Sequence, residues 1–273
     1  MPELPEVETV VRDLRPLLIG QTITELQYSK DKLRKPWQHQ WAKKIVRQQI
    51  LAIERRAKWL VIRLAQPSGL VVHLGMTGQL QLFSADSPPA DHTHFRFVLA
   101  PCAEELRYRD IRRFGSIQWY ADIPKWYAEI NQTYGPEPWD ISPDDWYKRV
   151  HQLKRNWKAI LLDQSIISGL GNIYADETCF RAKINPSSLP VNSDKSTIIK
   201  ILESARDILT EAIELRGSTI RNYIGGSGLK GNFQDEFAVY GRTELPCPNC
   251  GSPIQQVRLA GRSTHFCPQC QQV

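Results

Sequence analysis

The chain of 273 residues carries 35 Lys and Arg against 29 Asp and Glu, a net charge of +6. Its pI of about 9.0 makes a polyanion a plausible partner. A hydrophobic content of 41% with eight Trp and nine Tyr excludes a disordered chain. No apolar run approaches the roughly 18 residues of a transmembrane helix, and no signal-peptide pattern is present. We therefore expect a soluble, cytoplasmic protein without a membrane role.

The positive charge is concentrated in two runs. Between Trp41 and Arg63 lie seven Lys and Arg residues against Glu54 alone, and four arginines between 107 and 113 face only Asp110. Aromatic residues lie within or beside both runs. Each run by itself is compatible with a solvated charged face, and the two together favour binding to nucleic acid.

The first predicted element is a helix. Apolar residues between Leu4 and Leu18 follow helical spacing, and Gly20 ends the pattern. Pro2 would then lie at the N-terminal end of this helix. The helix dipole at that end disfavours a protonated amine and favours nearby carboxylates.

Pro2 is a candidate nucleophile because it directly follows Met1. If Met1 is removed, the ring nitrogen becomes a free secondary amine, and α-amino groups have a pKa near 8, below that of lysine. Such an amine can form an iminium with a sugar C1′. Glu3 and Glu6 supply carboxylates beside it. An inert Met-Pro start remains the alternative.

Short β-like runs follow the helix and alternate with turn residues. Their spacing predicts a β-sandwich or barrel-like first domain over residues 1–132, which ends before the Pro-rich linker Tyr134–Pro138. The predicted strands are Ile45–Ile53, Trp59–Leu64, Leu70–Leu74, Gln79–Phe83, Phe95–Leu99 and Ile117–Tyr120.

Residues 133–232 are predicted to form a helical domain. A glycine break at Ser168–Gly171 precedes a helix over Asn172–Lys183, and a longer amphipathic helix ends at Gly217. This order is typical of helix-turn-helix DNA-binding proteins, although any αα-hairpin gives the same pattern. The glycine-rich segment Gly225–Gly231 is either a flexible linker or a lid over a substrate.

Residues 233–273 contain two CxxC pairs separated by sixteen residues: Cys247, Cys250, Cys267 and Cys270. Four thiolates in two tight turns predict one structural Zn²⁺ in a closed tetrahedral site with no open position for water. His265 is interpreted as an ordinary strand residue. The segment Gln255–Phe266 predicts a β-hairpin whose tip presents Arg262, a residue suited to phosphate contact or groove insertion.

Seven motifs together carry a resemblance that runs from residue 2 to residue 270. The chain resembles the formamidopyrimidine-DNA glycosylase family, bacterial repair enzymes that remove 8-oxoguanine and ring-opened purines. Besides the four-cysteine finger, the motifs are Pro2-Glu3-Leu4-Pro5-Glu6-Val7-Glu8-Thr9, Arg55-Arg56-Ala57-Lys58, His73-Leu74-Gly75-Met76-Thr77-Gly78, Arg112-Arg113-Phe114-Gly115, Gly135-Pro136-Glu137-Pro138 and Gly169-Leu170-Gly171-Asn172-Ile173-Tyr174-Ala175. The chain departs from the family pattern at Ile111, where a proline is frequent, and at Glu244, where a glycine is usual.

The resemblance implies an α+β fold with an N-terminal β-sandwich, a helix–two-turns–helix domain and a zinc-finger hairpin that clasp DNA. The damaged nucleotide is flipped out of the stack, because the sugar C1′ is unreachable inside a duplex. The base is then expelled through a Schiff base, and β- and δ-elimination cut the strand. The implied partner is damaged double-stranded DNA, bound by a monomer in the bacterial cytoplasm and nucleoid. The structural zinc is the one implied cofactor, and no small-molecule cofactor is expected.

The resemblance also implies roles for individual residues. Pro2 is the nucleophile, Glu3 protonates the sugar ring oxygen and Glu6 supports the amine. Lys58 is assigned to β-elimination, and Arg262 to δ-elimination and phosphate binding. The DNA-contacting positions are His73, His92, Lys154, Asn172 and Tyr240; the residues that fill the hole left by the base are Met76, Arg112 and Phe114; and Ser218, with the glycine-rich segment, closes over the base.

Three alternatives remain at this point. Endonuclease VIII has the same fold and nucleophile but prefers oxidised pyrimidines, and Leu4 with the void-filling trio favours the purine enzyme. A non-catalytic DNA-binding zinc protein would be expected to lack Pro2, Glu3 or Lys58, and all are present. A zinc hydrolase is disfavoured by the closed four-cysteine site.

Overall fold

The computed structural model describes residues 1–219, 226 and 228–272. Of the predicted lid, Gly225 and Ser227 lie outside the described residues. The chain forms two compact units, one of Met1–Glu129 with Leu215–Asn232 and the other of Ile130–Glu214 with Phe233–Val273. In the part of the chain that is described, no helix is long and apolar enough to cross a membrane.

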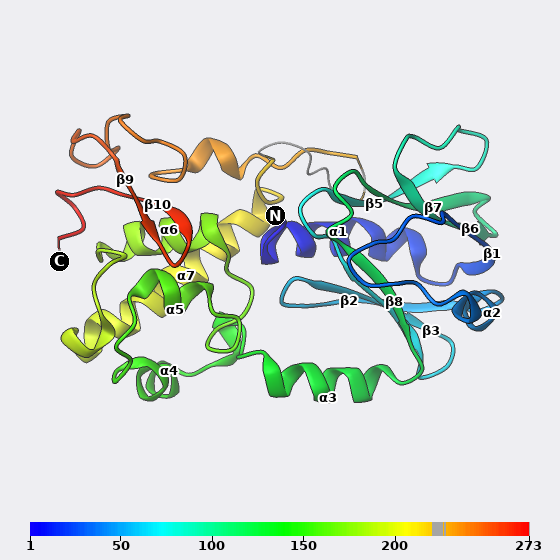
Figure 1. The fold of residues 1–273 in the computed structure, drawn as a ribbon, viewed down its shortest axis with the longest axis horizontal. Helices are drawn as coiled ribbons and strands as arrows, with labels where there is room; N and C mark the ends of the chain where they lie inside the picture. Colours follow the sequence, from blue (N-terminus) through cyan, green and yellow to red (C-terminus); the bar gives the residue numbers. More distant parts are fainter. Residues whose placement is uncertain (220–225, 227, 273) are drawn as a thin grey trace. The chain divides into compact units, whose positions relative to one another are not determined.

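The first unit contains two four-stranded antiparallel sheets and the helix α1 (Leu4–Leu18) (Figure 1). One sheet has the order β1-β6-β7-β5 and the other β2-β3-β4-β8. This arrangement confirms the predicted N-terminal sandwich. The strands are β1 (Thr22–Tyr28), β2 (Ile50–Arg56), β3 (Trp59–Leu64), β4 (Gly69–His73), β5 (Gly78–Ser84), β6 (Thr93–Ala100), β7 (Glu104–Asp110) and β8 (Ser116–Tyr120).

Helix α1 belongs to the core of this unit. Its apolar residues recur at helical spacing and are almost completely buried among strand residues of both sheets. The helix packs against β2, β3 and β5. Burial of that stripe fixes the helix axis, and therefore fixes where the residues at its N-terminus lie. The buried positions are Val7, Val10, Val11, Leu14 and Leu18.

The predicted strand Ile45–Ile53 was wrong in its first half. Residues 42–45 form the short helix α2 (Ala42–Ile45), and the strand begins only at Ile50. Arg47 between them has a left-handed backbone with φ of 69°, which an extended strand does not accommodate. The apolar spacing of residues 45–53 is compatible with a strand, but it gives no indication of the turn at Arg47.

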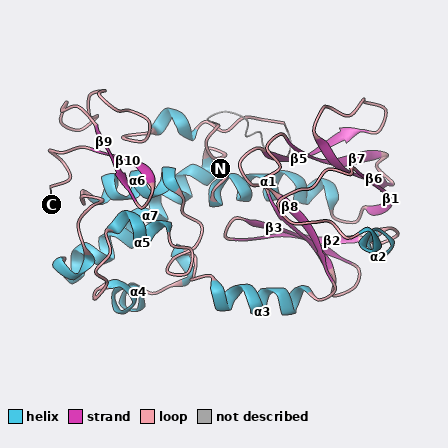
Figure 2. Cartoon of the chain, viewed as in Figure 1, coloured by secondary structure: helices cyan, strands magenta, loops and turns pink. Residues whose placement is uncertain are grey.

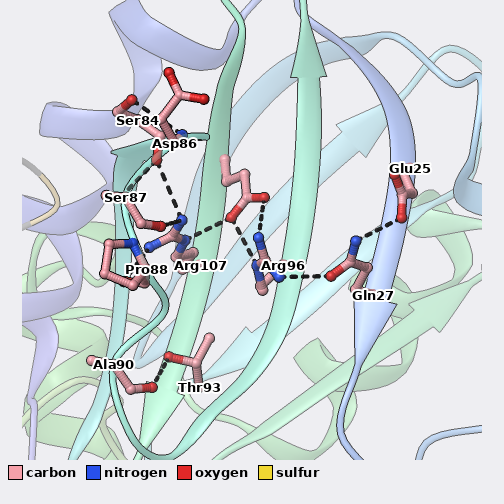
Figure 3. Close-up of polar contacts among 11 residues, drawn as sticks. Glu25, Gln27, Ser84, Asp86, Ser87, Pro88, Ala90, Thr93, Arg96 and Arg107 are labelled. Atoms are coloured by element: carbon pink, nitrogen blue, oxygen red, sulfur yellow. Dashed lines mark hydrogen bonds and ion pairs between the residues drawn. The ribbon is translucent and has the colours of Figure 1, made fainter.

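Strand β7 was not predicted because charged residues occupy it. Arg96 and Arg107 both donate to the carboxylate of Glu105, with Nη2–Oε1 and Nε–Oε2 distances of 2.6 and 2.7 Å. Arg107 also donates to the carbonyl oxygen of Ser87 at 2.6 Å (Figure 3). Arg107 is only 3% exposed, so this arginine of the second basic run is a structural residue of the sheet.

The second unit is helical and ends in a two-stranded hairpin (Figure 2). Side-chain caps begin two of its helices: Ser142 accepts from Asp145 N, and Asn156 accepts from Ala159 N. The elements that follow α3 (Ile123–Thr133) are α4 (Pro143–Val150), α5 (Trp157–Leu162), α6 (Asn172–Ala182), α7 (Lys195–Glu214), β9 (Gln255–Leu259) and β10 (Arg262–Phe266). Single 3₁₀ turns lie at Pro138–Asp140, Pro190–Asn192 and Phe233–Glu236, and a further one lies in the first unit at His39–Trp41.

The hairpin has a two-residue turn. Ala260 and Gly261 both have positive φ, 48° and 72°, which is the backbone of a type I′ turn. Arg262 is therefore the first residue of β10, directly after the turn, and it is exposed.

Candidate functional site

The N-terminus of α1 is organised by a buried carboxylate. Oε2 of Glu6 accepts from the backbone N–H of Glu3 at 2.7 Å, in a capping-box arrangement. Oε1 of Glu6 accepts from Ser218 N at 2.8 Å and from Ser218 Oγ at 3.0 Å. Pro2, Glu3, Glu6 and Ser218 are all buried, whereas Met1 is exposed. Glu6 thus joins the start of the helix to the segment that precedes the glycine-rich loop.

The approach of that segment requires a glycine. Gly217 has φ of +73°, and a Cβ added to it would lie 2.9 Å from Oε1 of Glu6. A larger residue there would have a strained backbone and would displace the Glu6 side chain.

Lys58 lies at the tip of the β2–β3 hairpin and is only 6% exposed. Ala57 beside it has a left-handed backbone with φ of 50°. Arg55 donates from Nη1 to the carbonyl oxygen of Ala57 at 3.1 Å and from Nε to Glu8 of α1 at 2.8 Å. The hairpin that carries Lys58 is therefore tied to α1, the helix that begins two residues after Pro2.

His73 ends strand β4 and accepts at Nδ1 from the backbone N–H of Gly75 at 3.1 Å. Burial is the largest cause that lowers its pKa to about 4, and the charges of Lys58 and Arg34 lower it further. The ring is therefore neutral near pH 7, with its proton on Nε2. It is a hydrogen-bond donor, held edge-on against the ring of Trp59.

Exposed apolar side chains gather on two loops after β4 and β7. Met76 is 41% exposed, Phe114 45% and Ile111 41%. The guanidinium carbon of Arg112 lies 4.7 Å from the centre of the Phe114 ring. Exposed apolar side chains rimmed by cations are typical of an interaction surface. Ile111, singled out in the sequence as a departure, adds a third apolar side chain to the pair.

In the second unit, the predicted site residue Asn172 is the first residue of α6, which packs against strand β10 of the hairpin. Nδ2 of Asn172 donates to the carbonyl oxygen of Ser263 at 3.0 Å, and its buried Oδ1 has no hydrogen-bond partner in the described structure. The backbone N–H of Tyr240 donates to Glu177 at 2.8 Å. Lys154 is exposed before α5. Asn172 therefore holds the same strand whose first residue is Arg262.

Sequence reasoning missed a buried charge network in this unit. Nζ of Lys158 donates to the carbonyl oxygen of Asn172 at 2.9 Å and to Asp176 Oδ1 at 2.5 Å. Oδ2 of Asp176 accepts from the backbone N–H and from Nδ1 of His265, at 3.0 and 2.9 Å. His265 lies in strand β10, as predicted, and outside the four-cysteine cluster, and its side chain also takes part in this network. No sequence signal joins these three residues, because they come from three separate elements.

The four cysteines form a candidate metal centre. Their sulfur atoms all lie within 4.8 Å of one another, and the Cys247–Cys270 and Cys250–Cys267 pairs are 3.9 and 3.5 Å apart. Zn–S bonds of about 2.3 Å in a tetrahedron require sulfur atoms about 3.8 Å apart. The geometry therefore fits Zn²⁺ and confirms the predicted zinc site.

The predicted site residues divide between the two units. The first unit holds Pro2, Glu3, Glu6, Lys58, His73, Met76, His92, Arg112, Phe114 and Ser218; the second holds Lys154, Asn172, Tyr240, Arg262 and the four cysteines.

Comparisons with known proteins agree with this organisation. The formamidopyrimidine-DNA glycosylase N-terminal domain matches residues 1–117, its H2TH domain residues 134–223, and the zinc finger found in this enzyme and in isoleucyl-tRNA synthetase residues 244–273. A formamidopyrimidine-DNA glycosylase of Thermomicrobium roseum is 40% identical over 289 residues, covering 99% of each chain. One of Pelotomaculum thermopropionicum is 40% identical over 276 residues, covering 100% of each chain.

Solved structures give the same result. The Lactococcus lactis enzyme, crystallised as its G226P mutant with DNA containing a formamidopyrimidine lesion, superposes with a TM-score of 0.92. It is 35% identical, with 100% of both chains covered. The same TM-score is found for a complex of that enzyme with abasic-site DNA.

The sandwich, the H2TH helices and the four-cysteine hairpin define the class of zinc-finger DNA glycosylases of base-excision repair. Within that class, the chain belongs to the formamidopyrimidine-DNA glycosylase family, whose members combine glycosylase and AP lyase activities.

Proposed function

We propose that this chain, as a monomer, excises oxidised purines from double-stranded DNA through a covalent intermediate on Pro2. The observation that carries the proposal is the Glu6 carboxylate, which joins Glu3 N–H at the start of α1 to both N–H and O–H of Ser218. This contact brings Glu3, the neighbour of the candidate nucleophile Pro2, and Ser218, the residue proposed to close over the base, to the same buried carboxylate.

The covalent step begins with removal of Met1. The freed nitrogen of Pro2 attacks C1′ and loses its proton, the bond from C1′ to the base breaks, and the base leaves with a proton. Glu3 donates a proton to the sugar ring oxygen, so that the ring opens to an iminium between Pro2 and C1′. Glu6 holds the backbone that carries the amine.

Strand cleavage follows from the iminium. Lys58 takes a proton from C2′, and the 3′ phosphate leaves in β-elimination. Arg262 assists loss of the 5′ phosphate in δ-elimination and binds phosphate. The buried position of Lys58, on a hairpin tied to α1 by Arg55 and Glu8, supports its role beside Pro2.

DNA binding uses groups in both units. His73, His92, Lys154, Asn172 and Tyr240 contact the DNA; the neutral His73 ring offers its Nε2–H to a phosphate oxygen. Met76, Arg112 and Phe114 occupy the stack after the base is flipped out, and Ser218 with the glycine-rich segment closes over the base. We place the enzyme in the cytoplasm, associated with the nucleoid.

The choice between oxidised purines and pyrimidines is tested by covalent trapping. Borohydride reduces the iminium and links protein to DNA, so trapping on 8-oxoguanine and thymine glycol duplexes ranks the two lesion classes. We expect faster trapping on 8-oxoguanine. Faster trapping on thymine glycol would favour the endonuclease VIII-like alternative, a comparison worth making because the Lactococcus enzyme was also crystallised with an oxidised pyrimidine.

A further inference from the structure

Asp110 ends strand β7 and is completely buried between the two loops that carry the exposed side chains. Its Oδ1 accepts from Thr77 Oγ at 2.5 Å and from the backbone N–H of Arg112 at 3.3 Å. Its Oδ2 accepts from the backbone N–H of Gly115 at 2.8 Å and from Tyr108 Oη at 3.2 Å. One carboxylate therefore contacts both loops at the same time.

The two loops are also joined directly. Oγ of Thr77 accepts from the backbone N–H of Arg112 at 3.0 Å while it donates to Asp110. A Cβ added to Gly75 would lie 2.4 Å from the backbone nitrogen of Gly115. A Cβ on Gly115 would lie 1.9 Å from Tyr108 Oη. The two loops are therefore closely packed against each other at Gly75 and Gly115.

Hydrogen bonds to an ionised acceptor in a buried place are the strong ones. Four donors converge on Asp110, and none of them belongs to a side chain that contacts DNA in the proposed function. Arg112 and Gly115 contribute backbone N–H groups only, which leaves the side chains of Arg112 and Phe114 free to face outward. Both are exposed.

We propose that Asp110 is a positioning residue that makes the Met76 loop and the 111–115 loop a single rigid wedge. Met76 enters the DNA stack together with Arg112 and Phe114, because one carboxylate fixes both loops. This inference rests on the proposed void-filling function of the three side chains. It adds Asp110 and Thr77 to the residues that determine how a paired lesion is opened.

The inference predicts different effects on the reaction rates of two substrates. A paired 8-oxoguanine must be unstacked before Pro2 reaches C1′, and the wedge recovers part of that cost. A preformed abasic site has no damaged base to unstack. Loosening the wedge should therefore slow the first reaction and spare the second.

The test compares Asp110→Asn and Thr77→Val with Phe114→Ala. Asp110→Asn replaces one acceptor oxygen by an N–H₂ group, which faces the N–H and O–H donors around Asp110. Thr77→Val removes the bridging hydroxyl and keeps the shape of the side chain. The single-turnover rate of 8-oxoguanine excision opposite cytosine should fall about tenfold or more in both variants. A loosened wedge misplaces the reacting nucleotide, and small errors in position slow a reaction by large factors. Cleavage of an abasic-site duplex by the same preparations should change less than about twofold.

Thr178→Val is the matched control. Its hydroxyl is buried in the second unit and has no hydrogen-bond partner among the described residues. The same chemical change at this position should alter the reaction rate on neither substrate. Normal abasic-site cleavage by each variant also shows that it is folded, and Thr77→Val keeps the test available if Asp110→Asn does not fold.

Four outcomes decide the matter. The wedge is supported if both variants lose excision rate on the paired lesion but not on the abasic site. The double variant Asp110→Asn/Phe114→Ala should then excise the paired lesion no more slowly than the slower of its two single variants. Equal losses on both substrates, or no loss, with Phe114→Ala still selective, overturn this inference alone. If Phe114→Ala is itself not selective, the void-filling assignment and the wedge both fail. Additive losses in the double variant would contradict a shared mechanism.

Discussion

Lys158 and Asp176 form a fully buried ion pair, with 2.5 Å between Nζ and Oδ1 and no exposed surface on either side chain. Asp176 holds His265 of β10, and Asn172, one turn earlier on α6, holds Ser263. Four helix residues rise about 6 Å, and two strand residues span about 6.7 Å. The two spacings match, so α6 side chains satisfy one edge of the strand that begins with Arg262.

Replacement of one partner should therefore be costly. We expect Lys158→Met to lower the free energy of unfolding by about 3–5 kcal/mol, because it leaves the Asp176 charge buried without its partner. Urea unfolding measures this loss. Lys148→Met is the control: its pair with Asp145 is exposed, and such pairs contribute about 0–1 kcal/mol. Equal losses in the two variants would contradict the buried-pair account.

His73 should make stability depend on pH. Its pKa is lowered to about 4 in the folded chain, against about 6.5 unfolded, so below pH 6.5 the unfolded state binds the extra proton. The contribution is complete above pH 6.5 and is lost as pH falls toward 4, up to about 3 kcal/mol. The free energy of unfolding, measured between pH 4 and 8, should change less steeply with pH in His73→Asn than in the unmodified protein. Identical slopes would show that the ring is not buried as a neutral group.

The metal should be structural. We expect one Zn²⁺ per chain by elemental analysis, and loss of DNA binding when a chelator removes it, because metal binding and folding of the hairpin are coupled. Cys267→Ser should do the same without chelator. A fully active protein that contains no metal would contradict this expectation.

Arg262 should contribute one phosphate contact. Each neutralised phosphate changes the slope of log affinity against log salt by about −0.9. Arg262→Ala should therefore make the slope shallower by about one unit, as measured by fluorescence anisotropy on undamaged duplex. Lys148→Ala, which removes an exposed cation already paired within α4, should leave the slope unchanged.

The sequence predicted the elements that have a clear period or motif. Helix α1, strand β3 and the four-cysteine hairpin lie where spacing places them, because local patterns determine them. Strand β7 was missed because its charges are compensated by partners on β6 and in the loop after β5. Such pairing depends on strands that are distant in sequence, and no local pattern records it.

The same limit applies to the site. Motif residues such as Glu6 and Lys58 were identified from the sequence, and their roles stay predictions. Asp110 was noted only as the acid within a basic run, and Thr77 only as part of a motif. Their importance appears only when Thr77, Tyr108 and Gly115 converge on one carboxylate. Tertiary hydrogen bonds of this kind are not readable from the sequence.

The most direct test of the account identifies the residue that carries the covalent intermediate. Borohydride-trapped protein on an 8-oxoguanine duplex is digested and mapped by mass spectrometry. We predict that the mature chain begins at Pro2, that the reduced sugar is attached to its nitrogen, and that Pro2→Gly sharply slows base release. Attachment at Lys58 or another lysine, or normal trapping by protein that retains Met1, would contradict the central claim.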